Sequence, residues 1–150
     1  MAAGDNAVGN CSPIRLLVAD DHPVVREGLA AVIAEQPDLR LVAVAENGRQ
    51  AVELYRAHLP DVGLVDLRMP VMDGVEAIRA ITRDFPSARL IALTTFEGDR
   101  DIPRALEAGA RGHLLKDMLL SYLIGAVRAA HRGQRVIPPA LTQACPHREA

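Results

Sequence analysis

The sequence predicts an α/β domain, a doubly wound parallel sheet with helices on both faces, and three observations support this. Apolar strand-like runs and amphipathic helix-like stretches alternate five times along the chain. The connections between them are short, as in right-handed β–α–β crossovers. Polar residues stand at the carboxyl ends of the strands, where ligands bind in open sheets of this kind.

The first two strand–helix units have clear boundaries. Residues 14–20 (IRLLVAD) are almost continuously apolar, which is typical of a strand buried on both faces. Residues 23–35 repeat apolar side chains at helical spacing, and Pro23 is tolerated in a first turn because its missing N–H would have no partner there. Residues 39–45 (LRLVAVA) form the second strand, and Asn-Gly then ends it before a helix over 49–58.

The next two units follow the same pattern. Residues 62–66 (VGLVD) predict a short buried strand, and the polar loop LRMPVMDG leads to a helix over 74–84. Residues 89–94 predict the fourth strand. The helix over 101–108 is short and only moderately apolar.

The last unit has a strand over 112–115 and a helix over 119–132, whose apolar stripe is the clearest in the chain. The domain is therefore expected to span 14–135. Residues 1–13 are small, polar and aperiodic and predict a disordered lead. Residues 136–150 contain two consecutive prolines and predict a linker or tail.

Composition excludes several other classes of protein. The 150 residues contain 49% hydrophobic and 24% charged residues, and the net charge of −2 provides no basic face for non-specific nucleic-acid binding. No apolar run approaches the ~20 residues of a membrane span, and no signal-peptide pattern opens the chain. We therefore expect a cytoplasmic protein without membrane contact.

Five polar residues end or follow the predicted strands: Asp20, Asp21, Asp66, Thr94 and Lys116. The carboxyl ends of parallel strands lie side by side, so these groups should converge on one edge. Carboxylates beside an ammonium and a hydroxyl suit a hard divalent cation and a phosphoryl group.

Four motifs in order then carry a family resemblance: DDHPVVREGL, VDLRMPVMDG, ALTTFEGD and AGARGHLLKD. With them the chain resembles the response regulator receiver domains of NarL/FixJ/LuxR-type transcription factors over 14–135. The resemblance implies the flavodoxin-like (CheY-like) fold, with five parallel strands in the order 2-1-3-4-5.

The resemblance also implies roles for the acids. Asp66 would be the phosphoacceptor, because a carboxylate oxygen can attack phosphorus and form an acyl phosphate. Asp21 would bind Mg²⁺ directly and Asp20 through water, with Asp66 and the backbone carbonyl of Arg68 as further ligands. The N–H groups of Leu67 and Arg68 would contact the phosphoryl group. The Arg68 side chain would either lie over that group or be solvated.

Thr94 and Lys116 would each bind a phosphoryl oxygen, with Thr94 also acting in the switch. The chain departs from the family at His113, where receivers usually carry Tyr or Phe. Either the coupling between this side chain and Thr94 is altered, or His113 rests at the surface. The other histidines receive no phosphotransfer role, and His22 is expected to shape the start of a helix.

By resemblance, a sensor histidine kinase would donate the phosphoryl group, and phosphorylation would shift a switch controlling homodimerisation. DNA would be bound only through a C-terminal helix-turn-helix domain that is absent here. The chain itself would not be an enzyme but a signalling acceptor that assists its own phosphoryl transfer and dephosphorylation. The alternative is a stand-alone receiver that acts by protein–protein contact or in a phosphorelay.

Enzymes of similar topology fit less well. A haloacid-dehalogenase-like phosphatase needs two acids separated by two positions after its first strand, whereas the acids here are adjacent. A flavin protein needs aromatic stacking partners, and the chain has two Tyr, two Phe and no Trp.

Overall fold

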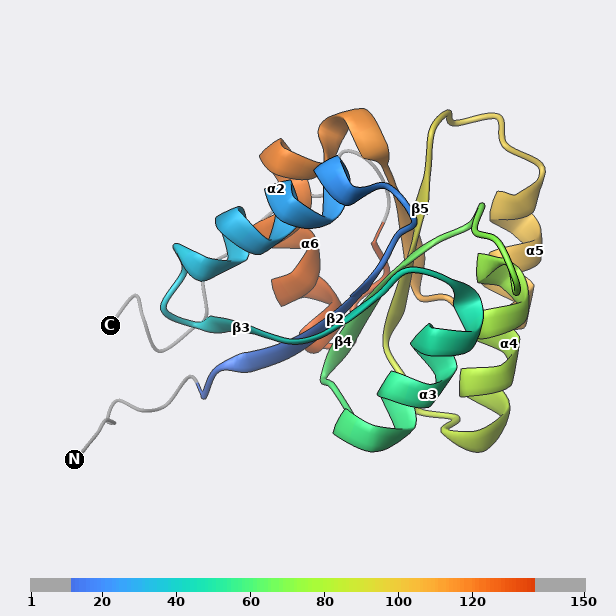
Figure 1. Cartoon of the computed structure of the whole chain (residues 1–150), viewed down its shortest axis with the longest axis horizontal. Coiled ribbons are helices and arrows are strands. Elements are labelled where there is room, and N and C mark those ends of the chain that lie inside the picture. The colour runs from blue at the N-terminus through green and yellow to red at the C-terminus, as the bar shows by residue number, and fades with distance from the viewer. Residues whose placement is uncertain (1–11, 137–150) are drawn as a thin grey trace.

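The computed structural model describes residues 12–136, which form a five-stranded parallel sheet between two layers of helices (Figure 1). The strands are β2 (Ile14–Ala19), β3 (Leu39–Ala45), β4 (Val62–Asp66), β5 (Leu90–Thr94) and β6 (Gly112–Leu115). The helices are α2 (Pro23–Ala34), α3 (Gly48–His58), α4 (Gly74–Asp84), α5 (Asp101–Ala108) and α6 (Leu119–His131), with a 3-10 turn, η1 (Lys116–Met118), before α6. The predicted strands and helices are confirmed, each end within one residue. The predicted lead, 1–13, falls almost wholly outside the described residues.

The strands lie in the order β3-β2-β4-β5-β6, and all neighbours are parallel. Numbered along the chain, this is the predicted order 2-1-3-4-5. The central strand is β4, whose Leu64 pairs with Val18 of β2 and with Ile91 of β5. All five residues of β4 are buried, which explains its continuous apolar run.

The two faces of the sheet are covered by different helices (Figure 1). On one face Leu29 of α2 and Leu123 of α6 join a common apolar core. On the other face the core includes Val52 of α3, Ile78 of α4 and Ile102 of α5. Because apolar cores cover both faces of the sheet, a polar binding site is expected at the sheet edges or at the strand ends. In the described part of the chain, no helix has the length and apolar character needed to cross a membrane.

The loop between β4 and α4 is fixed by local contacts. Asp73 caps α4 by accepting the N–H of Glu76, and the Glu76 carboxylate accepts the N–H of Asp73 in return. The N–H of Gly74 donates to the carbonyl of Leu67 at 3.0 Å. A Cβ on Gly74 would lie 2.1 Å from the carbonyl oxygen of Asp66, so only glycine allows this close approach.

The described part of the chain ends shortly after α6. Val136, the first residue of the predicted linker or tail (136–150), is buried and forms a parallel bridge to Gly112. The N–H of His113 donates to the carbonyl of Val136 at 2.9 Å. A one-residue bridge has no periodicity, so the sequence pattern could not predict it. The predicted tail beyond this point, 137–150, lies outside the described residues.

Candidate functional site

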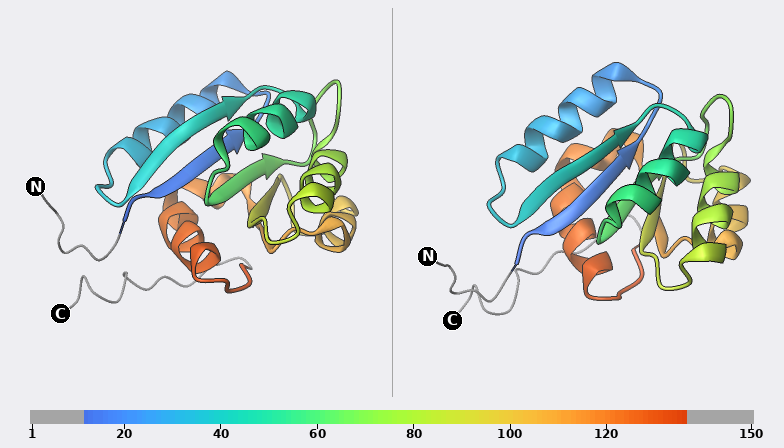
Figure 2. Two further views of the ribbon diagram at one scale, coloured as in Figure 1. Left: turned by 90° about the horizontal axis from the view of Figure 1, so that it is seen from below. Right: turned by 60° about the horizontal axis from the view of Figure 1, so that its bottom comes forward.

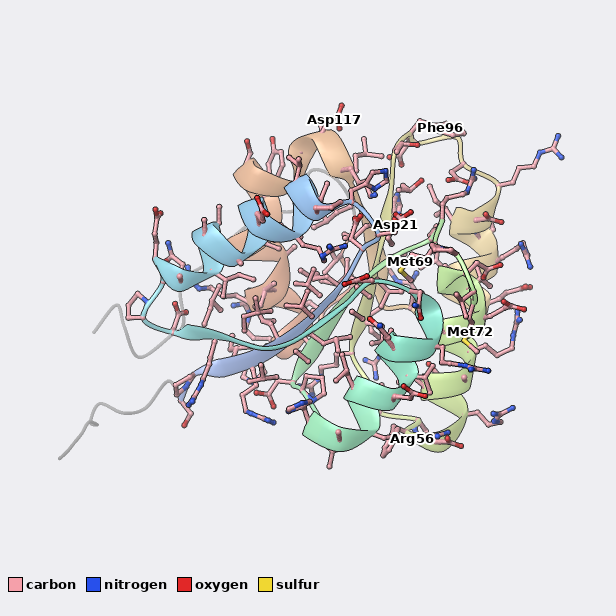
Figure 3. All side chains as sticks on the ribbon, in the orientation of Figure 1. Asp21, Arg56, Met69, Met72, Phe96 and Asp117 are labelled. Atoms are coloured by element: carbon pink, nitrogen blue, oxygen red, sulfur yellow. The ribbon has the colours of Figure 1, made fainter. Side chains whose placement is uncertain are left out.

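Three strands bring acids and a lysine together at the carboxyl edge of the sheet, where the arrowheads of β2 and β4 end side by side (Figure 2). Asp20 follows β2 directly, Asp66 is the last residue of β4, and Lys116 follows β6. The Lys116 Nζ lies 2.9 Å from Asp20 Oδ2 and 3.0 Å from Asp66 Oδ2. Asp21, labelled where β2 ends in Figure 3, lies beside these acids. Four of the five residues predicted to converge are therefore close together.

The carboxylates carry more charge than their partners neutralise. Asp20 and Asp66 are buried, and Asp21 is partly exposed. Among the described residues, Asp20 Oδ2 and Asp66 Oδ2 receive no hydrogen bond beyond their ion pairs with Lys116. One oxygen from each of the three acids and one His22 nitrogen lie within 4.8 Å of one another. Buried oxygen ligands with this excess of negative charge fit a hard divalent cation such as Mg²⁺.

The electrostatics of the pair Asp66–Lys116 reflect this crowding. Burial raises the pKa of Asp66 from 3.8 to about 6, and the neighbouring Asp20 adds to the shift, while Lys116 and the Arg68 N–H oppose it. Burial alone would lower the pKa of Lys116, but its bonds to Asp20 and Asp66 outweigh burial and raise it. The ammonium is therefore charged and favours the ionised form of Asp66. A bound cation would favour that form as well.

His22 is closer to the site than the sequence predicted. Its backbone starts α2, as expected, but its side chain makes no helix cap. Instead Nδ1 lies 3.0 Å from Asp20 Oδ1, 3.2 Å from Asp21 Oδ1 and 3.3 Å from Lys116 Nζ. An imidazole nitrogen suits transition metals better than Mg²⁺, so His22 fits a hydrogen-bonding role beside the acids. Its position directly after the acid pair was the available signal.

Thr94 has a partner that the sequence analysis missed. Its buried hydroxyl donates to Asp99 Oδ2 at 2.6 Å. Asp99 lies in the loop between β5 and α5, is buried, and accepts the N–H of Asp101 at 2.9 Å. Burial would raise the pKa of Asp99, but hydrogen bonds from Thr94, the Asp101 N–H and Arg68 outweigh it, so the pKa is lowered and the carboxylate is ionised. A loop aspartate is usually solvated, so its residue type alone gave no signal.

Arg68 connects the acceptor loop to Asp99. Its N–H donates to Asp66 Oδ1 at 3.2 Å, and its guanidinium binds Asp99 and approaches Asp101 Oδ2 at 3.3 Å. The side chain is thus tied to the β5–α5 loop. We expected the N–H groups of both Leu67 and Arg68 to meet a group on Asp66. That was wrong for Leu67, whose N–H donates to the Leu93 carbonyl within the sheet.

His113 is buried in β6, so the expectation that it could rest at the surface is wrong. Its Nε2 lies 3.2 Å from Glu97 Oε2. Its Nδ1 is buried and has no hydrogen-bond partner among residues 12–136. The side chain therefore links β6 to the loop that contains Asp99.

Comparison with known proteins is consistent with this site. The family model described as response regulator receiver domain matches residues 16–128. The transcriptional regulatory protein LnrK of Bacillus subtilis is 43% identical over 129 residues, which are 86% of this chain and 59% of LnrK. The nitrate/nitrite response regulator protein NarL of Escherichia coli K12 is 37% identical over 135 residues, 90% of this chain and 62% of NarL. The chain thus spans about three fifths of these curated relatives.

Solved structures give the same result. A LuxR-family two-component response regulator from Aurantimonas sp. SI85-9A1 superposes with a TM-score of 0.80 at 36% identity, covering 85% of this chain and 91% of the other. The signal receiver domain of the putative response regulator NarL from Mycobacterium tuberculosis has a TM-score of 0.76 at 35% identity, covering 82% and 99%.

Proposed function

This chain belongs to the family of response regulator receiver domains of the NarL/LuxR type, and we propose that its Asp66 accepts a phosphoryl group from a sensor histidine kinase. One observation carries the proposal. Asp66 ends the central strand at the carboxyl edge, 3.0 Å from the ammonium of Lys116 and beside a second buried acid, Asp20. An isolated structural aspartate needs neither neighbour.

The transfer would be a direct displacement at phosphorus. A carboxylate oxygen of Asp66 forms a bond to phosphorus while the bond from phosphorus to the donor breaks. The electron pair of the broken bond stays with the donor, which is a histidine nitrogen of the kinase or an acetate oxygen. Because Asp66 must be ionised to attack, groups that favour its charged form favour the reaction.

The acids also support binding of Mg²⁺. Asp20, Asp21 and Asp66 would hold the ion with the backbone carbonyl of Arg68, Asp20 acting through water. When bound, the ion offsets the repulsion between Asp66 and an incoming phosphoryl group.

Lys116 and Thr94 would bind two oxygens of the phosphoryl group. The ammonium of Lys116 already lies at Asp66 and needs only a small shift to meet an oxygen attached to it. The hydroxyl of Thr94 must first leave Asp99. Movement of Thr94, together with His113, would then alter the β5–α5 loop and act as the switch.

The switch would control homodimerisation and, in the complete regulator, DNA binding by a C-terminal domain. The relatives LnrK and NarL, of which this chain covers about three fifths, support this output. The alternative is a receiver that acts through protein–protein contacts or passes its phosphoryl group on in a relay. In both cases the chain acts as a signalling acceptor that assists its own phosphoryl transfer and dephosphorylation, and not as an enzyme.

The first experiment is intact mass spectrometry after incubation with acetyl phosphate, with and without Mg²⁺. The proposal predicts one phosphoryl adduct that requires Mg²⁺ and disappears in Asp66→Asn. Asp61→Asn is the matched control, because Asp61 precedes the same strand at the opposite edge, where it accepts the Arg15 N–H. An adduct that persists in Asp66→Asn would contradict the assignment.

Dimerisation separates the two outputs. Size-exclusion chromatography with light scattering should show a larger mass for the phosphorylated chain than for the unmodified chain. A phosphorylated monomer that transfers its phosphoryl group to a histidine phosphotransfer protein would favour the relay.

A further inference from the structure

Thr94 has a single O–H, and in this structure that O–H is already used. It donates to Asp99 Oδ2 at 2.6 Å, in a buried position. A hydrogen bond of this length from a hydroxyl to a carboxylate belongs to the strong, charge-assisted class. Thr94 cannot donate to a phosphoryl group on Asp66 while it donates to Asp99.

Asp99 is itself held in place by two further elements. Its Oδ1 accepts the N–H of Asp101, at the start of α5, and binds the guanidinium of Arg68, from the β4–α4 loop. Asp99 therefore joins the end of β5, the loop after Asp66 and the start of α5. When Thr94 leaves, Oδ1 keeps these two partners, and the guanidinium of Arg68 still balances the charge of the carboxylate. Release of Thr94 thus costs the hydrogen bond at Oδ2 but leaves the buried charge of Asp99 paired.

We propose that Asp99 is a positioning residue that holds the Thr94 hydroxyl in the unphosphorylated state and so opposes the switch. The inference rests on the proposed function of Asp66. Phosphorylation would draw Thr94 from Asp99 to the phosphoryl oxygens. The strength of the Thr94–Asp99 hydrogen bond would then contribute to the free-energy difference between the two states of the switch.

The test uses beryllofluoride, a phosphoryl mimic that binds carboxylates without a chemical step. Asp99→Asn keeps the size of the side chain but removes its charge, so the retained hydrogen bond weakens. The affinity of the chain for beryllofluoride in Mg²⁺ should rise by about tenfold. The readout is titration followed by NMR of backbone amides.

A double-mutant cycle separates this effect from a structural one. In a Thr94→Val background, Asp99→Asn should leave the affinity unchanged, because no hydroxyl remains to be held. An equal rise in both backgrounds would overturn the proposal. Asp101→Asn is the control for Arg68, since Asp101 meets the same guanidinium at 3.3 Å but makes no bond to Thr94. It should leave the affinity unchanged.

A second readout needs no variant. In the wild-type chain, the ¹³C signal of the Asp99 carboxyl should shift when beryllofluoride saturates the site, because it loses the Thr94 bond. An unshifted signal at saturation would overturn the inference even if Asp99→Asn does not fold. A wild-type chain that neither forms the acetyl-phosphate adduct nor binds beryllofluoride overturns the proposed function and this inference together. Normal binding with no effect of Asp99→Asn overturns this inference alone.

Discussion

Lys116 Nζ lies 3.0 Å from Asp66 Oδ2, although β5 separates β4 from β6 in the sheet. The lysine therefore extends past one strand to reach the acid of the next. It is the one lysine in the sequence, and all the other residues in the combined total of Lys and Arg are arginines. A flexible ammonium is suited to this task because it can follow an oxygen that moves from a carboxylate to a phosphoryl group.

Replacing Lys116 tests that relationship. Lys116→Met should slow adduct formation with acetyl phosphate by about 100-fold, since it removes a charge aimed at the reacting oxygens. Lys116→Arg keeps the positive charge but places it on a rigid, forked guanidinium, so its rate of adduct formation should fall between those of wild type and Lys116→Met. Time-resolved intact mass spectrometry provides the rates. Equal rates for Lys116→Met and wild type would show that the ammonium has only a structural role.

The raised pKa of Asp66 predicts a pH-dependent stability in the absence of metal. The folded protein holds its proton more tightly (pKa about 6) than the unfolded chain (3.8), so Asp66 favours folding below pH 3.8 and loses that contribution as pH rises through 6. The shift corresponds to roughly 3 kcal/mol. Urea unfolding in EDTA should therefore show Asp66→Asn gaining on wild type between about pH 4 and 6.

The same experiment includes its own control. Added Mg²⁺ at pH 7.5 should raise the unfolding midpoint of wild type more than that of Asp66→Asn, because the ion binds the folded carboxylates. A constant difference between wild type and Asp66→Asn across this range would contradict the raised pKa.

Alanine substitutions at two glycines should have opposite effects on stability. Gly74→Ala forces a Cβ to 2.1 Å from the Asp66 carbonyl oxygen, so it should destabilise the fold by about 1–3 kcal/mol and reduce adduct formation. Gly28→Ala lies within α2 with no atom near the new Cβ, and should stabilise by about 0.5–1 kcal/mol with normal phosphorylation. Urea unfolding and intact mass compare the two. A neutral Gly74→Ala would mean that the loop after β4 is more adaptable than its contacts indicate.

His113→Phe should raise the free energy of unfolding by about 1 kcal/mol. The buried Nδ1 of His113 has no partner within residues 12–136, and an apolar ring of similar shape removes this desolvation cost. It also removes the contact with Glu97, so dimerisation on phosphorylation should change while the rate of adduct formation does not. Loss of stability instead would show that the contact between His113 and Glu97 outweighs the unpaired nitrogen.

Much of the site was predictable because its residues follow strands directly. Asp20, Asp66 and Lys116 each end an apolar run, and parallel strands place such ends together. The Leu67 N–H was assigned wrongly because the sequence does not show that it completes the hydrogen bonds between β4 and β5. Asp99 was missed because it lies in a loop, where no periodicity fixes its neighbours.

The succession of strands and helices, the family, and the acids and lysine at the strand ends can all be predicted from the amino-acid sequence. These follow from local periodicity and from short motifs, and both are properties of nearby residues. The partner of each polar group is known only from the three-dimensional fold: Thr94 bonds to Asp99, Arg68 to Asp99 and Asp101, and His22 to the acid pair. The reason is physical. A buried donor or acceptor must be satisfied by whatever group the packing of distant elements brings within reach, and no local pattern encodes that choice.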